Sequence, residues 1–239
     1  MKQNTTLLLT LFIGLFAFSS CEKIKGEGPV VTETRSTSEF ERVNFGLSGT
    51  MIVEKGESLK VEISAQRNIL DVIRTSVSGR ELKLDIEKGK RIKRHEDITV
   101  RITMPEASGF RVSGSGNIRI PDGWTGSLMR LHIAGSGNIE ADDLDYNRIE
   151  CEIDGSGNIR VRDGAANDGR FTINGSGSVE MQEVEFRDSD VTINGSGSVR
   201  IWTVDHLKAR INGSGTVYYK GQPTVDSHVA GSGRVVRVN

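Results

Sequence analysis

The sequence has little cysteine and little proline for its length. Only two cysteines occur among 239 residues, which excludes a disulfide-stapled miniprotein and a zinc fold built on cysteine ligands. Four prolines, with no three-residue glycine period, exclude a collagen-like chain. Charge of one sign is lacking as well, because 31 Lys and Arg stand against 32 Asp and Glu. A general nucleic-acid-binding surface is therefore not expected.

Long hydrophobic runs are missing apart from one near the start. Leu7–Phe18 is an apolar run of 12 residues, and as a helix it spans about 18 Å, too short for a hydrocarbon core of about 30 Å. It is followed by Ser19, Ser20 and Cys21, a pattern that resembles the lipobox of bacterial lipoproteins, in which the cysteine is acylated. We predict a lipoprotein signal peptide over residues 1–20 and lipidation at Cys21. Ordinary cleavage beside the serines, which would give a free secreted protein, is the alternative.

Glycine is the abundant residue, with 28 copies where average usage gives about 17. Half of these glycines belong to seven copies of Gly-Ser-Gly, which follow one another at nearly regular intervals. The copies begin at Gly114, Gly135, Gly155, Gly175, Gly195, Gly213 and Gly231. A four-stranded propeller blade needs about 40 residues, and because the period here is about half as long, it favours a solenoid.

Apolar residues alternate around each copy, as expected of short half-buried strands. Two residues before the first glycine stand Val112, Ile133, Ile153, Ile173, Ile193, Ile211 and Val229. Four residues after it stand Ile118, Ile139, Ile159, Val179, Val199, Val217 and Val235. Polar ladders are expected because stacked side chains of this kind can hydrogen-bond between rungs. One ladder would comprise Asp154, Asn174, Asn194 and Asn212, and another Asn117, Asn138 and Asn158.

Charged residues indicate how the repeats stack, because their sign reverses at every step of two series. The first series is Arg130, Glu150, Arg170, Asp190, Lys208 and Asp226, and the second is Arg119, Glu140, Arg160, Glu180 and Arg200. Opposite charges attract across adjacent strands and like charges repel, whereas a hairpin meander would not place a residue beside its equivalent in the next repeat. We predict an all-β fold, a right-handed parallel β-helix of about seven 18–21-residue rungs over residues 106–239. The hand follows from the bias of parallel β crossovers.

Two further segments are expected before the rungs. Residues 21–37 are polar and contain glycine and proline, which predicts a flexible tether. Residues 38–105 contain several strand patterns and one short helical pattern near Asn68–Ile73, and we expect them to form an N-terminal β cap. Within this cap, Phe45–Thr50 looks like a degenerate copy of Phe110–Ser115.

The order of these features resembles that of a known family. A cysteine after small residues is followed by strands with one short helix, by Met104-Pro105, and then by rungs with Gly-Ser-Gly-[Asn/Ser]-[Ile/Val]. Over residues 38–239 the sequence is similar to the head GIN domain family of Bacteroidetes, whose members carry the label auto-transporter adhesin. The resemblance implies a parallel β-helix in the cell envelope. It implies no established chemistry and supplies no catalytic residues.

Few residues point to chemistry of their own. Asp142, Asp143 and Asp145 leave a calcium site open, although the nine-residue glycine-aspartate repeat of calcium-bound β-rolls is absent. The four histidines share no ligand spacing, so no zinc site is expected. Cys151 lies in an apolar column, which favours a buried structural thiol over a nucleophile. Regularly alternating charges favour structural ladders over a cluster of acid, base and cation. We expect no enzyme and no cofactor.

One cationic segment stands apart from the repeats. It comprises Lys88, Lys90, Arg91, Lys93 and Arg94, and it is expected in a loop between two strands. A solvated hairpin loop accounts for such a charge run. The alternative is contact with anionic lipid or polysaccharide near the membrane.

Together these features favour a non-enzymatic lipoprotein that is lipid-anchored in the outer membrane, on the cell surface or the periplasmic face. It would act as an adhesion or binding module. The expected partners are the membrane, through the acyl anchor, and a polysaccharide or surface protein; a homo-oligomer is also open, since uncapped solenoid ends tend to stack. The alternative functions are a periplasmic scaffold or envelope-stress accessory protein, and a carbohydrate-active β-helix enzyme.

Overall fold

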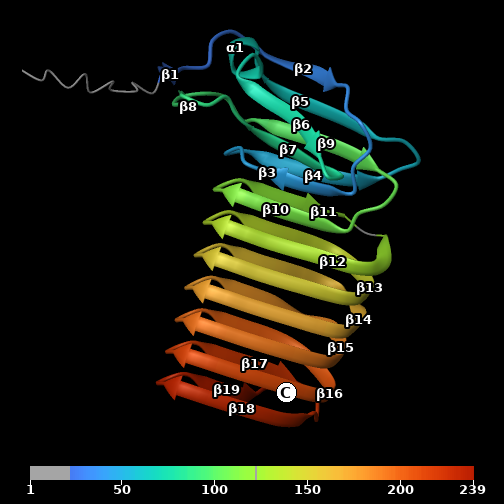
Figure 1. Ribbon diagram of the computed structural model, residues 1–239, viewed down its shortest axis with the longest axis vertical. Coiled ribbons are helices and arrows are strands. Elements are labelled where there is room, and N and C mark those ends of the chain that lie inside the picture. Colours follow the sequence, from blue (N-terminus) through green and yellow to red (C-terminus); the bar gives the residue numbers. More distant parts are fainter. Residues whose placement is uncertain (1–21, 122) are drawn as a thin grey trace, which may run out of the picture.

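The fold is seen in a computed structural model that describes residues 22–121 and 123–239. It is nearly all β-structure, a solenoid of about six turns with one short helix (Figure 1). The all-β parallel architecture predicted from the repeats is confirmed. The sequence predicts about seven rungs, and the structure has about six turns. The two numbers are close, because seven Gly-Ser-Gly corners have six intervals between them. The apolar run Leu7–Phe18 and Cys21 lie outside the described residues.

The repeats stack in chain order, and each long strand runs from one Gly-Ser-Gly corner to the next (Figure 1). Pairing is parallel and in register, so that Ile153 lies opposite Ile173. Between β15 and β16 the register shifts, and the repeat is shorter from there onward. The strands are β10 (Gly109–Gly114), β11 (Asn117–Ile120), β12 (Trp124–Gly135), β13 (Asn138–Gly155), β14 (Asn158–Gly175), β15 (Ser178–Gly195), β16 (Ser198–Gly213), β17 (Thr216–Lys220), β18 (Thr224–Gly231) and β19 (Arg234–Arg237).

The alternating apolar residues form the core of the solenoid. Every member of the two predicted columns from Val112 to Ile211 and from Ile118 to Val217 is fully buried. Their last members differ, because Val229 is 38% exposed and Val235 is only partly buried. Both lie on the last rung of the described residues, and no strand within 22–121 and 123–239 pairs with its outer edge.

The Gly-Ser-Gly corners need glycine at their first position for two reasons. The first glycines have φ between 125° and 145°, a region that other residues rarely adopt. A Cβ on Gly175 would also lie 2.2 Å from the carbonyl oxygen of Gly155 on the preceding rung. That oxygen accepts a hydrogen bond from the amide of Ser176 at 2.9 Å. The corners therefore stack backbone directly on backbone.

The N-terminal cap continues the parallel strand stack of the solenoid. Strands β3 (Arg42–Phe45) and β4 (Thr50–Lys55) pair in parallel with β10 and β11. Strands β7 (Glu81–Ile86) and β9 (Thr99–Met104) continue the stack in parallel. The cap then changes direction, because the next strands pair antiparallel to β9 and β7. These are β5 (Lys60–Gln66) and β6 (Ile73–Ser78), joined through α1 (Arg67–Leu70).

The degenerate corner predicted within Phe45–Thr50 exists, but its register with β10 and β11 differs by two residues from the predicted match to Phe110–Ser115. Phe45 lies opposite Val112, and Thr50 lies opposite Asn117. The segment Leu47-Ser48-Gly49 therefore occupies the place of a Gly-Ser-Gly corner. The comparison of the two sequences matches Phe45 to Phe110. In the fold Phe45 instead pairs with Val112, whose side chain is buried in the same core. Leu47 itself is 1% exposed.

The segment 21–37 corrects the prediction of a flexible tether. From residue 22 onward it contains β1 (Glu22–Ile24), parallel to β8 (Lys90–Ile92), and β2 (Val30–Arg35), antiparallel to β5. The Thr32 and Ser64 hydroxyls are 2.8 Å apart across the β2–β5 pair. Polar side chains suit an edge strand whose surroundings are solvent, so a polar composition here did not mean absence of structure.

Candidate functional site

The outward surface of the rod carries the first charge series as a column. Strand pairing places Arg130 opposite Glu150, and Glu150 opposite Arg170. Arg130 Nε lies 3.0 Å from Glu150 Oε2, and Arg170 Nη1 lies 4.0 Å from Glu150 Oε1. The register then continues through Asp190, Lys208 and Asp226. Asp190 forms its ion pair diagonally with Arg210, at 3.4 Å.

The second series also forms a column, from Arg119 through Glu140, Arg160 and Glu180 to Arg200. Arg160 and Glu180 form an ion pair. The guanidinium carbon of Arg200 lies 4.0 Å from the ring centroid of Tyr218, a cation–π contact. These groups are exposed, so each pair contributes only a few tenths of a kcal/mol. The columns favour one register more than they stabilise the fold.

A third column holds two like charges side by side. Asp168 lies directly opposite Asp188, an arrangement that costs stability by itself. Each carboxylate has a cationic or donor partner: Arg148 Nη2 is 2.9 Å from Asp168, and His206 Nδ1 is 2.7 Å from Asp188. Sequence reasoning missed this column, although Arg148, Asp168 and Asp188 recur with the same spacing as the corners of their rungs.

A groove of about 380 Å³ follows this third column across successive rungs. Gly169, Ser189 and Leu207 are among its lining residues, and the Ser189 hydroxyl is 2.8 Å from that of Thr203. Charged lining residues of both signs surround them, including Arg170, Asp190, Lys208 and Asp226. The groove thus offers hydrogen-bond donors and acceptors to a polar ligand lying along the rod.

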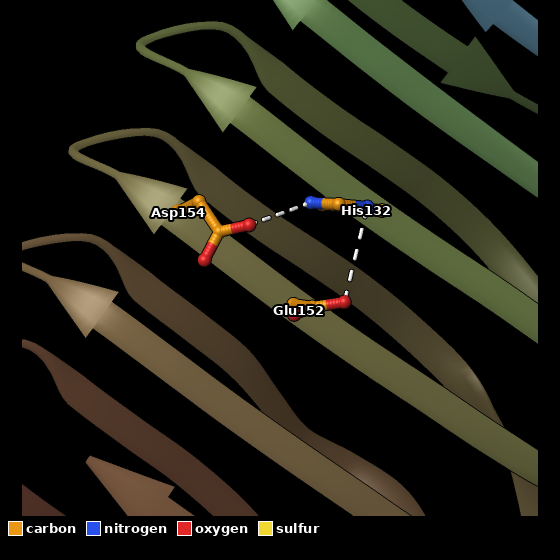
Figure 2. Close-up of side chains that lie close together, drawn as sticks. All are labelled: His132, Glu152 and Asp154. Carbon is orange, nitrogen blue, oxygen red and sulfur yellow. Dashed lines mark hydrogen bonds and ion pairs between the residues drawn. The ribbon is translucent and has the colours of Figure 1, made fainter. Parts of the chain in front are cut away.

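His132, Glu152 and Asp154 bring a histidine and two carboxylates together on adjacent rungs (Figure 2). Arg111 Nη1 lies 2.8 Å from His132 Nδ1, and since a guanidinium only donates, Nδ1 must accept. The imidazole proton is therefore on Nε2, where it is donated to Asp154 Oδ2 at 3.0 Å. Glu152 Oε2 lies 3.8 Å from Nδ1, beyond hydrogen-bond distance. This is a closed hydrogen-bond network, because both ring nitrogens are engaged by protein groups.

Asp154 also ends a ladder of side-chain amides. Asn174 donates to Asp154 at 2.8 Å, Asn194 to Asn174 at 2.9 Å, and Asn212 to Asn194 at 2.8 Å. A second ladder joins Asn117, Asn138, Asn158 and Ser178. The hydrogen bond from Asn174 is the largest cause that holds the pKa of Asp154 below its ordinary value. Burial opposes it, and the hydrogen bond from His132 lowers the pKa by a smaller effect than burial raises it.

Asn174→Ala is expected to raise the pKa of Asp154, because it removes the largest cause of the lowered value. A carboxyl whose pKa is lowered by folding adds stability above its unfolded pKa of about 3.9, and this is lost as pH falls through the folded pKa. The destabilisation caused by the variant should therefore shrink on acidification. Carboxyl-carbon NMR titration measures the shift, and Asn212→Ala, which leaves the bond to Asp154 in place, is the matched control. An unchanged Asp154 titration in Asn174→Ala would contradict the assignment.

Two buried groups have raised pKa values. Burial is the larger cause for the Cys151 thiol, with a smaller effect of the Glu150 charge, and Cys151 is 2% exposed. Burial likewise raises the pKa of Tyr146 to about 12, and its hydroxyl donates to the Ala107 carbonyl at 3.0 Å. A thiol that is buried and kept protonated is a structural group rather than a nucleophile.

The cationic segment is not a simple loop, which corrects the prediction made for it. Lys90, Arg91 and Ile92 form β8, whose register places Lys90 opposite Glu22 and Arg91 opposite Lys23. Lys90 forms an ion pair with Glu22, and this hydrogen bond is the main cause of a raised Lys90 pKa. The strand places the cations Lys88, Lys90, Arg91, Lys93 and Arg94 beside β1, the strand that follows Cys21.

The three aspartates considered for calcium do not converge. Asp142 forms an ion pair with Arg162 at 2.8 Å, and Asp145 accepts the amide hydrogen of Ala165 at 3.0 Å. Asp143 lies opposite Asp163. Within residues 22–121 and 123–239, the only group of three candidate ligands within 4.8 Å of one another is the His132 network. The acidic segment is thus held by protein partners.

The part of the chain that the structure describes contains no helix with the length and hydropathy needed to cross a membrane.

Comparisons with known proteins agree with this geometry. The family model described as "Putative auto-transporter adhesin, head GIN domain" matches residues 39–223. A search of curated proteins gives no match. Solved structures provide fold relatives, among them a protein from Bacteroides fragilis described as a putative adhesin, with 22% identity and a TM-score of 0.85. The match covers 90% of this chain and 100% of that one.

Two further structures have the same fold at lower similarity. A putative adhesin from Parabacteroides merdae and a "Putative lipid binding protein" from Parabacteroides distasonis each share 24% identity with a TM-score of 0.73. Each match covers 91% of this chain and 100% of the other. At these identities the likeness establishes the solenoid fold, and the residues of the surface are argued from this chain alone.

Proposed function

The chain belongs to the family described as "Putative auto-transporter adhesin, head GIN domain", and on that premise we propose that it is a non-enzymatic lipoprotein of the cell envelope. It is anchored in the outer membrane through acylated Cys21, and its solenoid acts as an adhesion module at the cell surface. A polysaccharide or a surface protein is the partner of the rod. The mixed-charge groove beside Asp168 and Asp188 supports a polar partner, because it presents donors and acceptors over several rungs.

The observation that carries this proposal is the position of the two ends. Strand β1 follows Cys21 directly and lies at the cap, whereas β18 and β19 lie at the opposite end of the rod (Figure 1). Because β1 is paired with β8 from Glu22 onward, an acyl chain on Cys21 holds the cap close to the bilayer. The rod itself, rather than a flexible tether, then carries the far end away from the membrane.

The anchor is tested by Cys21→Ser, which removes the acylation site. The protein is expected to move from the membrane fraction to the soluble fraction, since one cysteine carries the proposed anchor. Cys151→Ser is the matched control, because it removes the other cysteine of the chain and should leave the protein with the membrane. Retention of Cys21→Ser in the membrane would contradict the proposed anchor.

Antibody labelling of intact cells tests which side of the membrane the rod occupies. A surface adhesion module should be labelled on intact cells as strongly as after permeabilisation of the outer membrane. Labelling only after permeabilisation would contradict surface adhesion and favour the periplasmic scaffold.

Cationic side chains beside the anchor should strengthen its contact with anionic lipid. The test variant replaces Lys88, Arg91, Lys93 and Arg94 with serine and keeps the Lys90–Glu22 pair. Its binding to vesicles rich in anionic lipid is expected to weaken by roughly tenfold to a hundredfold, because each cation near such a surface contributes up to about 1 kcal/mol. Vesicle co-sedimentation at low and high salt measures this. The matched control replaces Arg119, Arg130, Arg160 and Arg170 on the rod, and equal losses in both variants would contradict a specific contact.

A further inference from the structure

The last rung of the solenoid has an apolar edge that the preceding rungs do not have. Val225 and Val229 on β18 are each 38% exposed. They lie opposite Leu207 and Ile211 on β16, which are 1% and 0% exposed. Strand β18 pairs with β16 on one side, and within residues 22–121 and 123–239 no strand pairs with its other side. An edge of this kind is a template for another strand.

Two polar side chains of β18 lie two residues apart, the Asp226 carboxylate and the His228 imidazole. Asp226 ends the column that alternates in sign from Arg130 onward. Asp226 and His228 are both exposed, and neither forms an ion pair with a residue that the structure describes. A partner strand must therefore place a hydrogen-bond donor over the Asp226 carboxylate and an acceptor over the His228 imidazole.

We propose that a second copy of this chain covers this edge, with its β18 antiparallel to the first about a twofold axis through Ser227. In this register Asp226 lies opposite His228 of the second copy, and Val225 lies opposite Val229. Each contact occurs twice, because a twofold interface is self-complementary. The valines extend the apolar core across the junction, and the two Asp226–His228 pairs extend the outer column.

Neighbouring registers are worse for physical reasons. A shift that puts the axis between two residues turns the valines of one copy toward solvent, because side chains alternate with a period of two. An axis through Asp226 sets the two Asp226 carboxylates directly opposite each other, which is repulsive. An axis through His228 sets the two imidazoles opposite each other and leaves Asp226 facing Ala230. Only the axis through Ser227 pairs each Asp226 carboxylate with an imidazole that can donate to it and also matches valine with valine.

Because the cap and β18 lie at opposite ends of the rod (Figure 1), this pairing joins rods end to end with their caps pointing away from each other. If both copies are anchored through Cys21, their membranes then lie on opposite sides of the junction. The edge pairing thus assigns a partner to the adhesion module, namely a second copy on a facing surface. This bridging of two surfaces rests on the proposed anchor, whereas the edge pairing does not.

Ser227→Cys tests the register directly. Because residue 227 faces itself across the axis, the two Cα atoms should be about 4.5–5.5 Å apart, within the range that a disulfide spans. Mild oxidation of the full protein should give a covalent dimer on a non-reducing gel. Thr224→Cys is the matched control on the same exposed strand. In the proposed register its two thiols lie roughly 20 Å apart along the strands, so no covalent dimer should form.

A charge exchange provides the second test. His228→Asp sets Asp226 against a carboxylate at both pairs, and it should weaken dimerisation by about tenfold or more in sedimentation velocity. Adding Asp226→His to this variant restores both carboxylate–imidazole pairs and should restore the dimer. A Ser227→Cys protein that stays monomeric like the control, or a double variant as weak as His228→Asp, overturns the pairing. Neither result contradicts the proposed acylation of Cys21. A Cys21→Ser protein that stays in the membrane fraction and still dimerises contradicts only the anchor.

Discussion

Gly175→Ala is expected to destabilise the fold by about 3–5 kcal/mol, among the largest effects of a single methyl group. The residue has φ of 141°, and a non-glycine residue in such a region costs about 1–3 kcal/mol. The added Cβ would also lie 2.2 Å from the Gly155 carbonyl oxygen, which is backbone and cannot rotate away. The stack must then open between these rungs, which lengthens the hydrogen bond from Ser176 to Gly155.

The first corner of the chain supplies a matched control for this prediction. Gly114 has φ of 145°, but a Cβ there would meet no atom within 4 Å, because Leu47-Ser48-Gly49 precedes it instead of a glycine corner. Gly114→Ala should therefore show only the conformational cost, about 1–3 kcal/mol. The free energy of unfolding, measured by urea titration followed by circular dichroism, compares the two variants. Equal losses would show that the close stacking of corners has no energetic consequence.

The fold could be predicted because its repeats record two constraints on every rung. Glycine recurs where the backbone needs a positive φ and where the preceding corner lies too close for a Cβ. Charge alternates where adjacent rungs place one side chain over another, as in Arg130, Glu150 and Arg170. A single β hairpin carries no such redundancy, but six successive intervals fix the register.

Other features could not be predicted because nothing repeats them. The strands β1 and β2 have polar sequences, and their pairing depends on β8 and β5, which are distant in the sequence. Arg111, His132 and Asp154 are three different residue types on three rungs, so no periodic signal links them. The Asp168–Asp188 pair did repeat, but its like charges break the alternation by which the other columns were recognised.

The rung that holds Phe186 differs from its neighbours in how it fills the core. Phe171 and Phe186 are fully buried, and their rings meet edge to face with centroids 5.2 Å apart and planes at 89°. Gly169 makes room for them, since a Cβ there would lie 2.7 Å from an atom of each ring. Phe186 lies opposite Ala166 and Thr203 in the register, so this aromatic pair fills core space beside smaller side chains of the adjacent rungs.

Phe186→Ala is expected to destabilise the protein by about 3–5 kcal/mol, the cost of truncating a buried phenylalanine, of which about 0.5–1.5 kcal/mol is the ring–ring contact. Because each rung of a solenoid contacts only its neighbours, the loss should be concentrated in β14, β15 and β16. Hydrogen exchange should therefore accelerate in these strands before it does so in the cap strands β7 and β9. Phe186→Leu is the control, since it keeps most of the volume and should cost less than about 1.5 kcal/mol beyond the ring contact. Hydrogen exchange that accelerates equally in the cap and in the rungs would contradict a stack in which each rung depends on its neighbours. A loss of unfolding free energy in Phe186→Ala no greater than in Phe186→Leu would contradict the close packing of the two rings.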